Sequence, residues 1–473
     1  MAADAKLRQR FDPAAFQSFR FTSRELDAHG HVTLRYALDD EVVFVEELDL
    51  PVTGELADRE LERADGLLSL LHWVAGVSYY KTAAPAQVLC EGGAPSPAVA
   101  ALLEALYSEG LGEFAYTNAL AELPRPRFPR TAVRARGAGS GRDADESPAE
   151  HADSAALAAG SPRRILVPVG GGKDSAVALE IVRRSGAQTA LFSIGDARPI
   201  ARTVAVAGLP HLLVRRRLDP CIAALNESGA LNGHVPITAI VSCVAALTAA
   251  LNGFESVAMA NERSASAGNL SWQGIDVNHQ FSKGLRAERL LTAALAELDA
   301  GVGCFSILRP ASELAIARAF ARLEPYHGAF TSCNKIFRLD PALRAAAWCC
   351  DCPKCRFVYL VLAPFSSPEH LRAVFGADLL ADELQFDGFA LLTATGGHKP
   401  FECVGEEQES LAAIRLLARD PRWRDHSVVR RLVAEVLPRH PASAGDPDAV
   451  LALSDDHDVP DALLPDVRAL LGA

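Results

Sequence analysis

The sequence predicts an α/β fold: a doubly wound parallel sheet with an α+β domain before it and a mostly helical region after it. Between residues 164 and 330, short β-like runs alternate with segments of helix length, which is typical of parallel sheets covered by helices on both faces. Between residues 18 and 50, apolar and polar residues alternate, as they do in half-buried antiparallel strands. The 473 residues are enough for about three domains.

The first predicted domain covers residues 1–130. After its alternating segment, apolar residues return every three or four positions between 58 and 108, which predicts helices packed on the strands. Residues 131–163 are rich in Ala, Gly, Ser and mixed charge and contain almost no large apolar side chain. Such a segment buries too little surface to fold alone, so we expect a flexible linker there.

The second predicted domain, residues 164–330, holds the strands of the parallel sheet at 165–169, 189–195, 211–216, 256–261 and 304–308. Ligands of such sheets bind beyond the carboxyl ends of the strands. The residues at those ends are Gly170 to Ser175, Ser193, Gly195, Arg215, Arg216, Asn261, Glu262 and Arg309. The uncharged run 235–254 contains Pro and many small residues, which favours a buried helix over a membrane span.

The composition narrows the class of partner. Lys and Arg together number 47 and Asp and Glu number 59, which gives a net charge of −12. This acidic balance disfavours binding to a nucleic-acid backbone. The N-terminus has no basic stretch followed by an apolar run, unlike a secretory signal peptide. We therefore expect a cytoplasmic protein with reduced cysteines and no membrane span.

A glycine-rich loop follows the first strand of the parallel sheet. Residues 170–175 read Gly-Gly-Gly-Lys-Asp-Ser and lead into a helix; the glycines let an anion approach the backbone, and the helix start offers free N–H groups. The loop fits neither the P-loop nor the dinucleotide-binding fingerprint. It resembles the Ser-Gly-Gly-x-Asp-Ser loop of the PP-loop ATP pyrophosphatases, whose fold is HUP-like and which bind ATP and release pyrophosphate. Gly170 stands where that superfamily often has Ser.

The resemblance to one family extends over nearly the whole chain. The segments that carry it are 260–269, 277–284, 305–320, 348–365 and 396–406. They resemble the MurL family of ATP-dependent UDP-N-acetylmuramoyl-L-alanyl-L-glutamate epimerases, which act in peptidoglycan precursor synthesis. The resemblance implies a reaction in which ATP becomes AMP and pyrophosphate while the terminal L-Glu of the UDP-muramoyl dipeptide is inverted to D-Glu through an acyl-adenylate.

The same resemblance implies roles for the residues of the loop. Asp174 would orient Mg²⁺ on the pyrophosphate, and Ser175 with the N–H groups of Gly171 and Gly172 would hold the leaving group. Lys173 would either neutralise phosphate charge or be a solvated side chain in the first helical turn. We expect Gly170 and Ser193 to complete the ATP site.

Residues at the other strand ends are candidates for substrate binding. Glu262 offers a second Mg²⁺ ligand and Asn261 a hydrogen-bond donor to a substrate carbonyl; helix capping and turn formation are the alternative for both. The two carboxylates and the diphosphate of the substrate require cations. The candidates are Lys283, Arg286 and Arg309, and surface solvation remains an alternative for Arg286.

The proton shuttle requires groups that accept and return a proton near neutral pH. The segment 396–406 supplies His398, Lys399 and Cys403. Cys403 would act as a base only if a neighbouring cation lowered the pKa of its thiol. The alternative is a buried cysteine that serves only in packing.

A cysteine cluster opens the third predicted region, residues 331–473, which we expect to be mostly helical. Cys349, Cys352 and Cys355 have Cys-x2-Cys-x2-Cys spacing, and Cys333 lies sixteen residues before the first of them. Thiolates at this spacing can bind Zn²⁺ tetrahedrally. The alternative is a set of reduced thiols packed beneath the following apolar helix.

Two other functions remain open from the sequence alone. One is a PP-loop enzyme that modifies tRNA or a base, against which the acidic composition weighs. The other is a non-catalytic nucleotide-binding module, which would not need the intact pair Asp174 and Ser175. A glutamine-dependent synthetase is disfavoured, because such enzymes need Cys directly after the initiator Met and this chain has Ala2.

Overall fold

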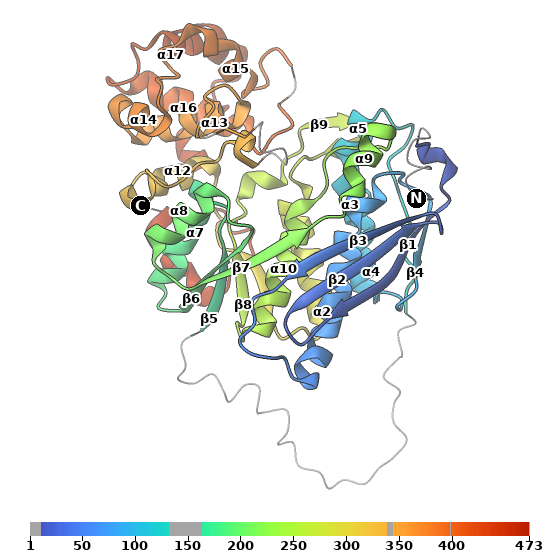
Figure 1. Cartoon of the computed structure of the whole chain (residues 1–473). Helices are drawn as coiled ribbons and strands as arrows, with labels where there is room; N and C mark the ends of the chain where they lie inside the picture. The colour runs from blue at the N-terminus through green and yellow to red at the C-terminus, as the bar shows by residue number, and fades with distance from the viewer. Residues whose placement is uncertain (1–10, 132–162, 338–343, 346, 398, 473) are drawn as a thin grey trace, which may run out of the picture.

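The computed structural model describes residues 11–131, 163–337, 344–345, 347–397 and 399–472. Its centre is a nine-stranded sheet in the order β11-β8-β5-β6-β7-β3-β2-β1-β4 (Figure 1). The strands are β1 (Ser18–Leu26), β2 (His31–Leu38), β3 (Val42–Asp49), β4 (Gln87–Cys90), β5 (Arg164–Pro168), β6 (Gln188–Ile194), β7 (His211–Arg217), β8 (Ser256–Met259) and β11 (Gly303–Ser306). A separate hairpin pairs β9 (Leu270–Trp272) with β10 (Ile275–Val277).

The five strands from β11 to β7 pair in parallel, and each lies within a few residues of a predicted run. The prediction of a parallel sheet in an α/β protein is therefore confirmed. Successive residues of β5 point to opposite faces of the sheet: Ile165 and Val167 belong to one hydrophobic core, and Leu166 belongs to the other. Helices cover both faces of this part of the sheet.

The N-terminal strands extend the same sheet. β1, β2 and β3 form the predicted antiparallel segment, and β3 then pairs antiparallel with β7 through Leu48 opposite Arg216. Beside this junction Arg216 Nε donates to Glu46 Oε1 at 2.7 Å, with the carboxylate fully buried. The sheet thus runs across the predicted boundary between the first two domains, whose limits stay a prediction. The predicted linker 131–163 lies outside the described residues except at its two ends.

The helices of the first two parts of the chain include those that pack on the sheet. They are α2 (Asp58–Ala75), α3 (Val77–Tyr80), α4 (Pro97–Tyr107), α5 (Gly112–Thr117), α7 (Lys173–Arg184), α8 (Arg198–Ala207), α9 (Cys221–Ser228), α10 (Ile237–Leu251), α11 (Leu285–Glu297) and α12 (Glu313–Phe320). The uncharged run 235–254 is α10, which packs against the sheet as predicted. Within the described ranges, no helix is both long and apolar enough to cross a membrane.

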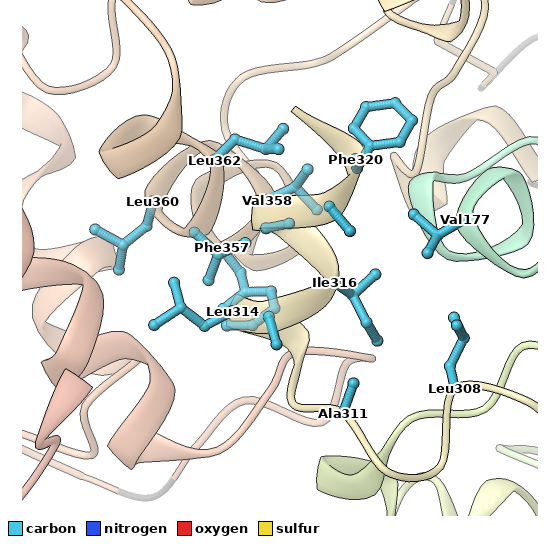
Figure 2. Close-up of a cluster of buried hydrophobic side chains, with 14 of the residues drawn as sticks. Val177, Leu308, Ala311, Leu314, Ile316, Phe320, Phe357, Val358, Leu360 and Leu362 are labelled. Atoms are coloured by element: carbon cyan, nitrogen blue, oxygen red, sulfur yellow. The ribbon is translucent and has the colours of Figure 1, made fainter. Parts of the chain in front are cut away.

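The C-terminal region is helical, as predicted, and lies beside α12 (Figure 1). It contains α13 (Pro353–Leu362), α14 (Pro368–Phe375), α15 (Phe386–Leu391), α16 (Glu407–Arg419), α17 (Ser427–Arg431), α18 (Pro447–Leu451) and α19 (Leu464–Leu471). Figure 2 shows α12 between α7 and α13, with Ile316 toward Val177 and Leu314 near Phe357. This packing determines where the first residues of the three helices meet.

Candidate active site

The glycine-rich loop connects β5 to α7 through a close backbone approach. Gly171 has a φ of +77°, and a Cβ placed there would lie 2.6 Å from the carbonyl carbon of Pro199 and 2.7 Å from the nitrogen of Ile200. A side chain is therefore excluded at this position. The nitrogen of Thr331 donates to the carbonyl oxygen of Gly171 at 2.9 Å. By contrast, nothing lies within 4 Å of a Cβ built on Gly170, so the loop is open on that side.

Lys173, the first residue of α7, is fully buried. Its ammonium group forms ion pairs with Asp174 and with Glu313. The alternative that Lys173 is a solvated side chain is therefore wrong. Ser175 is also buried, and its Oγ donates to the carbonyl oxygen of Gly172 at 3.0 Å.

The N-termini of four helices meet around Glu313, which begins α12. Lys173 begins α7, the ammonium group of Lys354 in the first turn of α13 lies 3.6 Å from the Glu313 carboxylate, and Glu409 near the start of α16 accepts the backbone N–H of Glu313 at 2.7 Å. Helix N-termini carry partial positive charge and free N–H groups. The four helix starts therefore stabilise negative charge at this point, where the Glu313 carboxylate lies.

Two carboxyl groups at this meeting point have opposite pKa shifts. Burial alone would raise the pKa of Glu313, but Lys173 and Lys354 lower it to about 2. Burial, together with the charge of Glu313, raises the pKa of Glu409 to about 8. Glu313 is thus a buried anion paired with two lysines, whereas burial next to that anion favours the neutral form of Glu409.

Glu262 and Lys283 lie close enough to this charge cluster to interact with Glu313 and Asp174. Burial raises the pKa of Glu262 against the attraction of Lys283. Glu262 precedes a short 3-10 helix, Arg263–Ser266, but makes no side-chain capping bond to it. Burial would lower the pKa of Lys283, but Cys403 and Glu262 raise it above its usual value. Glu262 therefore stands near cations and near Asp174, which would suit it as a metal ligand beside the loop.

Cys403 is half-buried and surrounded by cations. Lys283 Nζ lies 3.7 Å from its sulfur, and the His279 ring hydrogen-bonds to both the thiol and Glu113. Burial would raise the pKa of the thiol, but Lys283, His279 and Lys354 lower it to about 7. The condition that sequence analysis set for Cys403 as a base, a neighbouring cation, is met.

Lys399 and His398 are the other two candidates of the segment that contains Cys403. Lys399 is buried, and burial lowers its pKa against the opposing charges of Glu406 and Glu409. It therefore lies near the start of α16. His398 lies outside the described residues.

Several predicted binding residues have partners within the protein. Arg309 is buried, donating to the carbonyl oxygen of Glu262 and to Glu288 Oε2, each at 2.6 Å. Asn261 Nδ2 donates to Ser306 Oγ at 2.9 Å. Arg309 thereby fixes the backbone at Glu262, while contact of either residue with the substrate stays a prediction.

Arg286 and Ser193 have hydrogen-bond or ion-pair partners outside the charge cluster described above. The Arg286 side chain is 66% exposed and pairs with Glu109 at 2.6 Å, which agrees with the solvated alternative. Ser193 Oγ donates to the carbonyl oxygen of Gly195 at 2.8 Å and lies 2.8 Å from His211 Nε2. Both contacts of Ser193 are with other residues of the protein, so its role in the ATP site stays a prediction.

The predicted cysteine cluster comes together in space. The sulfurs of Cys333, Cys349, Cys352 and Cys355 lie within 4.8 Å of one another, and those of Cys349 and Cys355 are 3.7 Å apart. Zn–S bonds of about 2.3 Å in a tetrahedron place sulfurs about 3.8 Å apart, so the four residues fit zinc. Cys350 is excluded, because its thiol donates to the carbonyl oxygen of Phe375 at 3.3 Å.

Among the residues of the site that sequence reasoning missed are Glu113, His279, Glu313 and Lys354. His279, Glu313 and Lys354 lie inside segments that carry the family resemblance, which was the available signal. Nothing in the sequence distinguishes Glu113 from the other acidic residues, because it contributes only by its contact with His279.

Comparisons with known proteins agree with the resemblance. The model of the MurL N-terminal domain matches residues 10–307, and that of the MurL C-terminal domain matches residues 329–446. Three proteins named UDP-N-acetyl-alpha-D-muramoyl-L-alanyl-L-glutamate epimerase are similar over nearly their whole length. The protein of a Micromonospora species is 44% identical (94% of this chain, 96% of that protein), that of Salinispora tropica 45% (90% of each), and that of Xanthomonas oryzae pv. oryzae 38% (97% and 98%). The chain therefore belongs to the MurL family.

Proposed function

We propose that this protein inverts the terminal L-Glu of UDP-N-acetylmuramoyl-L-Ala-L-Glu to D-Glu. The observation that carries the proposal is the similarity over at least 90% of the chain to three proteins named for this epimerisation. Convergence of a low-pKa thiol and several buried charges supports an enzyme over a binding module. The proposal retains a cytoplasmic location and a small-molecule substrate, which the composition favours over a nucleic acid.

The proposal includes activation of the substrate by ATP at a PP-loop site. An oxygen of the α-carboxylate of the glutamate attacks the α-phosphorus of ATP, the bond from that phosphorus to the bridging oxygen breaks, and pyrophosphate leaves. The product is an acyl-adenylate, in which the carboxylate charge that opposes loss of the α-proton is removed. Water later attacks the acyl carbon, AMP leaves, and the carboxylate is restored.

The residues of the loop support this step. The open side at Gly170 and the close packing of Gly171 leave backbone for a phosphate chain to approach, and the start of α7 offers free N–H groups next to it. Asp174 and Glu262 would hold Mg²⁺, which when bound would offset the negative charge on the departing pyrophosphate. Lys173 keeps Asp174 and Glu313 in place through its buried ion pairs.

Proton transfer follows activation in the proposal. The Cys403 thiolate accepts the α-proton, and the electron pair is delocalised into the acyl carbonyl group. A second group then returns a proton to the opposite face. Lys399 and His398 remain the candidates for that group, because both belong to the same segment as Cys403.

The proposal also includes a structural zinc site at the four converging cysteines. Cys333, Cys349, Cys352 and Cys355 would all be used as ligands, which leaves no open position for substrate. Zinc there would fix the start of α13, and with it Lys354, against Glu313. Its contribution would therefore be to the geometry of the site and to stability.

The test uses the full-length protein with ATP, Mg²⁺ and the L-Glu dipeptide nucleotide. Chiral analysis of the glutamate after acid hydrolysis, together with a count of AMP, is expected to show both D-Glu and AMP. Asp174→Asn is expected to give neither, and Asp461→Asn, at an exposed position, is the matched control. AMP without D-Glu would refute the epimerase, and D-Glu without AMP would refute adenylation.

A further inference from the structure

Residues 399–406, called the Cys403 segment below, belong to the C-terminal region of the chain. They are bonded to the middle region of the chain through Pro400. The side-chain amide of Asn269 donates to the carbonyl oxygen of Pro400 at 2.9 Å. The side-chain oxygen of the same asparagine accepts the backbone N–H of His279 at 2.9 Å. Asn269 therefore sets the position of the Cys403 segment relative to His279.

His279 connects the thiol to a carboxylate. Its Nδ1 donates to Oε2 of Glu113, which lies in α5, and its ring also hydrogen-bonds to Cys403. Burial would lower the pKa of His279, but Cys403 and Glu113 raise it to about 9. The charged form of the ring is therefore favoured at neutral pH, with the thiol on one side and the carboxylate on the other, as in enzymes where a carboxylate orients a histidine against a nucleophile.

The other groups around the thiol include two cations and a neutral ring. Lys283 faces Cys403 from the segment after β10, and the ammonium group of Lys354 in α13 binds the carbonyl oxygen of Cys403 itself. The ring of His234 lies 4.3 Å from that of His279, and burial, together with His279, lowers the pKa of His234 to about 4. His234 therefore adds no charge at neutral pH, and Glu113 is the carboxylate bonded to His279.

We propose that Glu113 and His279 are positioning residues that hold Cys403 in its proton-accepting form during the epimerisation. The inference rests on the proposed function for the identity of the reaction but not for the state of the thiol. Neither residue takes the α-proton. His279 stabilises the thiolate before the transfer, and Glu113 keeps the ring charged and oriented.

The first measurement requires no substrate. The rate at which iodoacetamide alkylates Cys403 in the full-length protein is followed against pH by mass spectrometry of the peptide that contains it. Glu113→Gln and His279→Gln keep hydrogen-bonding groups but remove charge, so each is expected to raise the apparent pKa by about one unit or more and to slow alkylation at pH 7 several-fold. Glu113→Asp restores the charge and is expected to return the profile toward that of the wild type.

Controls separate this role from folding and from metal binding. Glu109→Gln removes a carboxylate on the preceding turn that pairs with the exposed Arg286, and it is expected to leave the profile unchanged. Unshifted profiles in both Glu113→Gln and His279→Gln would overturn the inference. A metal ion that copurifies with the wild type and is lost in His234→Gln would overturn it too, because the ligand atoms of Glu113, His234 and His279 lie within 4.8 Å of one another.

The second measurement separates this inference from the proposed function. With ATP and substrate in D₂O, Glu113→Gln and His279→Gln are expected to form AMP at rates near that of the wild type but to exchange the α-proton at least tenfold more slowly. If the wild type itself forms no AMP and exchanges no proton, the proposed function fails while the alkylation profiles still decide the state of the thiol. Equal loss of AMP formation and exchange in both variants would make the pair structural and overturn the inference.

Discussion

The Lys354 ammonium group lies 3.6 Å from the carboxylate of Glu313. Lys354 stands between two cysteines of the four-cysteine cluster, and Glu313 pairs with Lys173 at the start of the helix that follows the glycine-rich loop. One buried carboxylate thus connects the candidate metal centre to the candidate phosphate site. A substitution at the candidate metal centre is therefore expected to affect the candidate phosphate site, and the reverse.

The first prediction concerns zinc. Elemental analysis of the purified protein is expected to find about one zinc per chain. Cys352→Ser is expected to abolish zinc binding and to lower the melting temperature by several degrees. Its effect on stability is expected to be larger than its effect on activity. Cys352 is also the N-cap of α13, and because Ser is a good N-cap, the substitution tests the metal without removing the cap.

Cys350→Ser is the matched control, since Cys350 lies next to the cluster but bonds to the carbonyl oxygen of Phe375. It is expected to retain zinc. A fully active, stable wild type without any metal would leave only the interpretation of packed, reduced thiols.

The second prediction concerns the buried pair Lys173 and Glu313. Removing one partner leaves a buried charge poorly compensated, so Lys173→Met or Glu313→Gln is expected to reduce the free energy of unfolding by about 3–5 kcal/mol. The double variant is expected to lose less than the sum of the two. Chemical denaturation of all four proteins gives the cycle, and strictly additive losses would contradict the pairing.

Acid should weaken the same pair. Because the pKa of Glu313 is lowered to about 2 in the folded protein, its contribution to stability is present above the ordinary value of about 4.5 and is lost as the pH falls toward 2. The stability of Glu313→Gln is therefore expected to depend less on pH over this range than that of the wild type.

The third prediction compares two neighbouring glycines. Gly171→Ala forces a side chain against the backbone of Pro199 at a positive φ, and it is expected to cost about 1–3 kcal/mol of stability and to abolish AMP formation. Gly170→Ala meets nothing within 4 Å, so it is expected to fold normally and to raise the KM for ATP by occupying the open side of the loop. A normal KM in stable Gly170→Ala would place the nucleotide elsewhere.

The sequence predicts the parallel strands well because each is a local apolar run bounded by turn residues. It does not predict that β3 joins β7, since this pairing brings together residues about 170 positions apart, such as Leu48 and Arg216. The four-residue β4 also escapes prediction, because a strand so short has too few residues to show alternation. Local pattern determines the elements, while long-range packing determines their order in the sheet.

In the candidate site, too, local motifs are recognisable from the sequence and long-range contacts are not. The glycine-rich loop and the cysteine spacing are local motifs, and both are recognisable without a structure. The environment of Cys403 is not, because Lys283 and His279 are more than a hundred residues away in the chain. Sequence reasoning identifies the thiol and states that it needs a cation, but only the fold identifies which cations approach it.

The last prediction uses the pKa of Cys403. Since the thiol has a pKa lowered to about 7, the thiolate that accepts the α-proton is scarce below that pH and predominant above it. The rate of α-proton exchange in D₂O is therefore expected to rise about tenfold per pH unit below 7 and to level off above it.

Cys403→Ser is expected to keep AMP formation at a comparable rate, because the thiol takes no part in attack on the α-phosphorus. Its exchange is expected to fall much further and to lose the rise near pH 7, since a serine hydroxyl is a far weaker base. Normal exchange in Cys403→Ser would make the thiol a packing residue and direct the same test to Lys399 and His398.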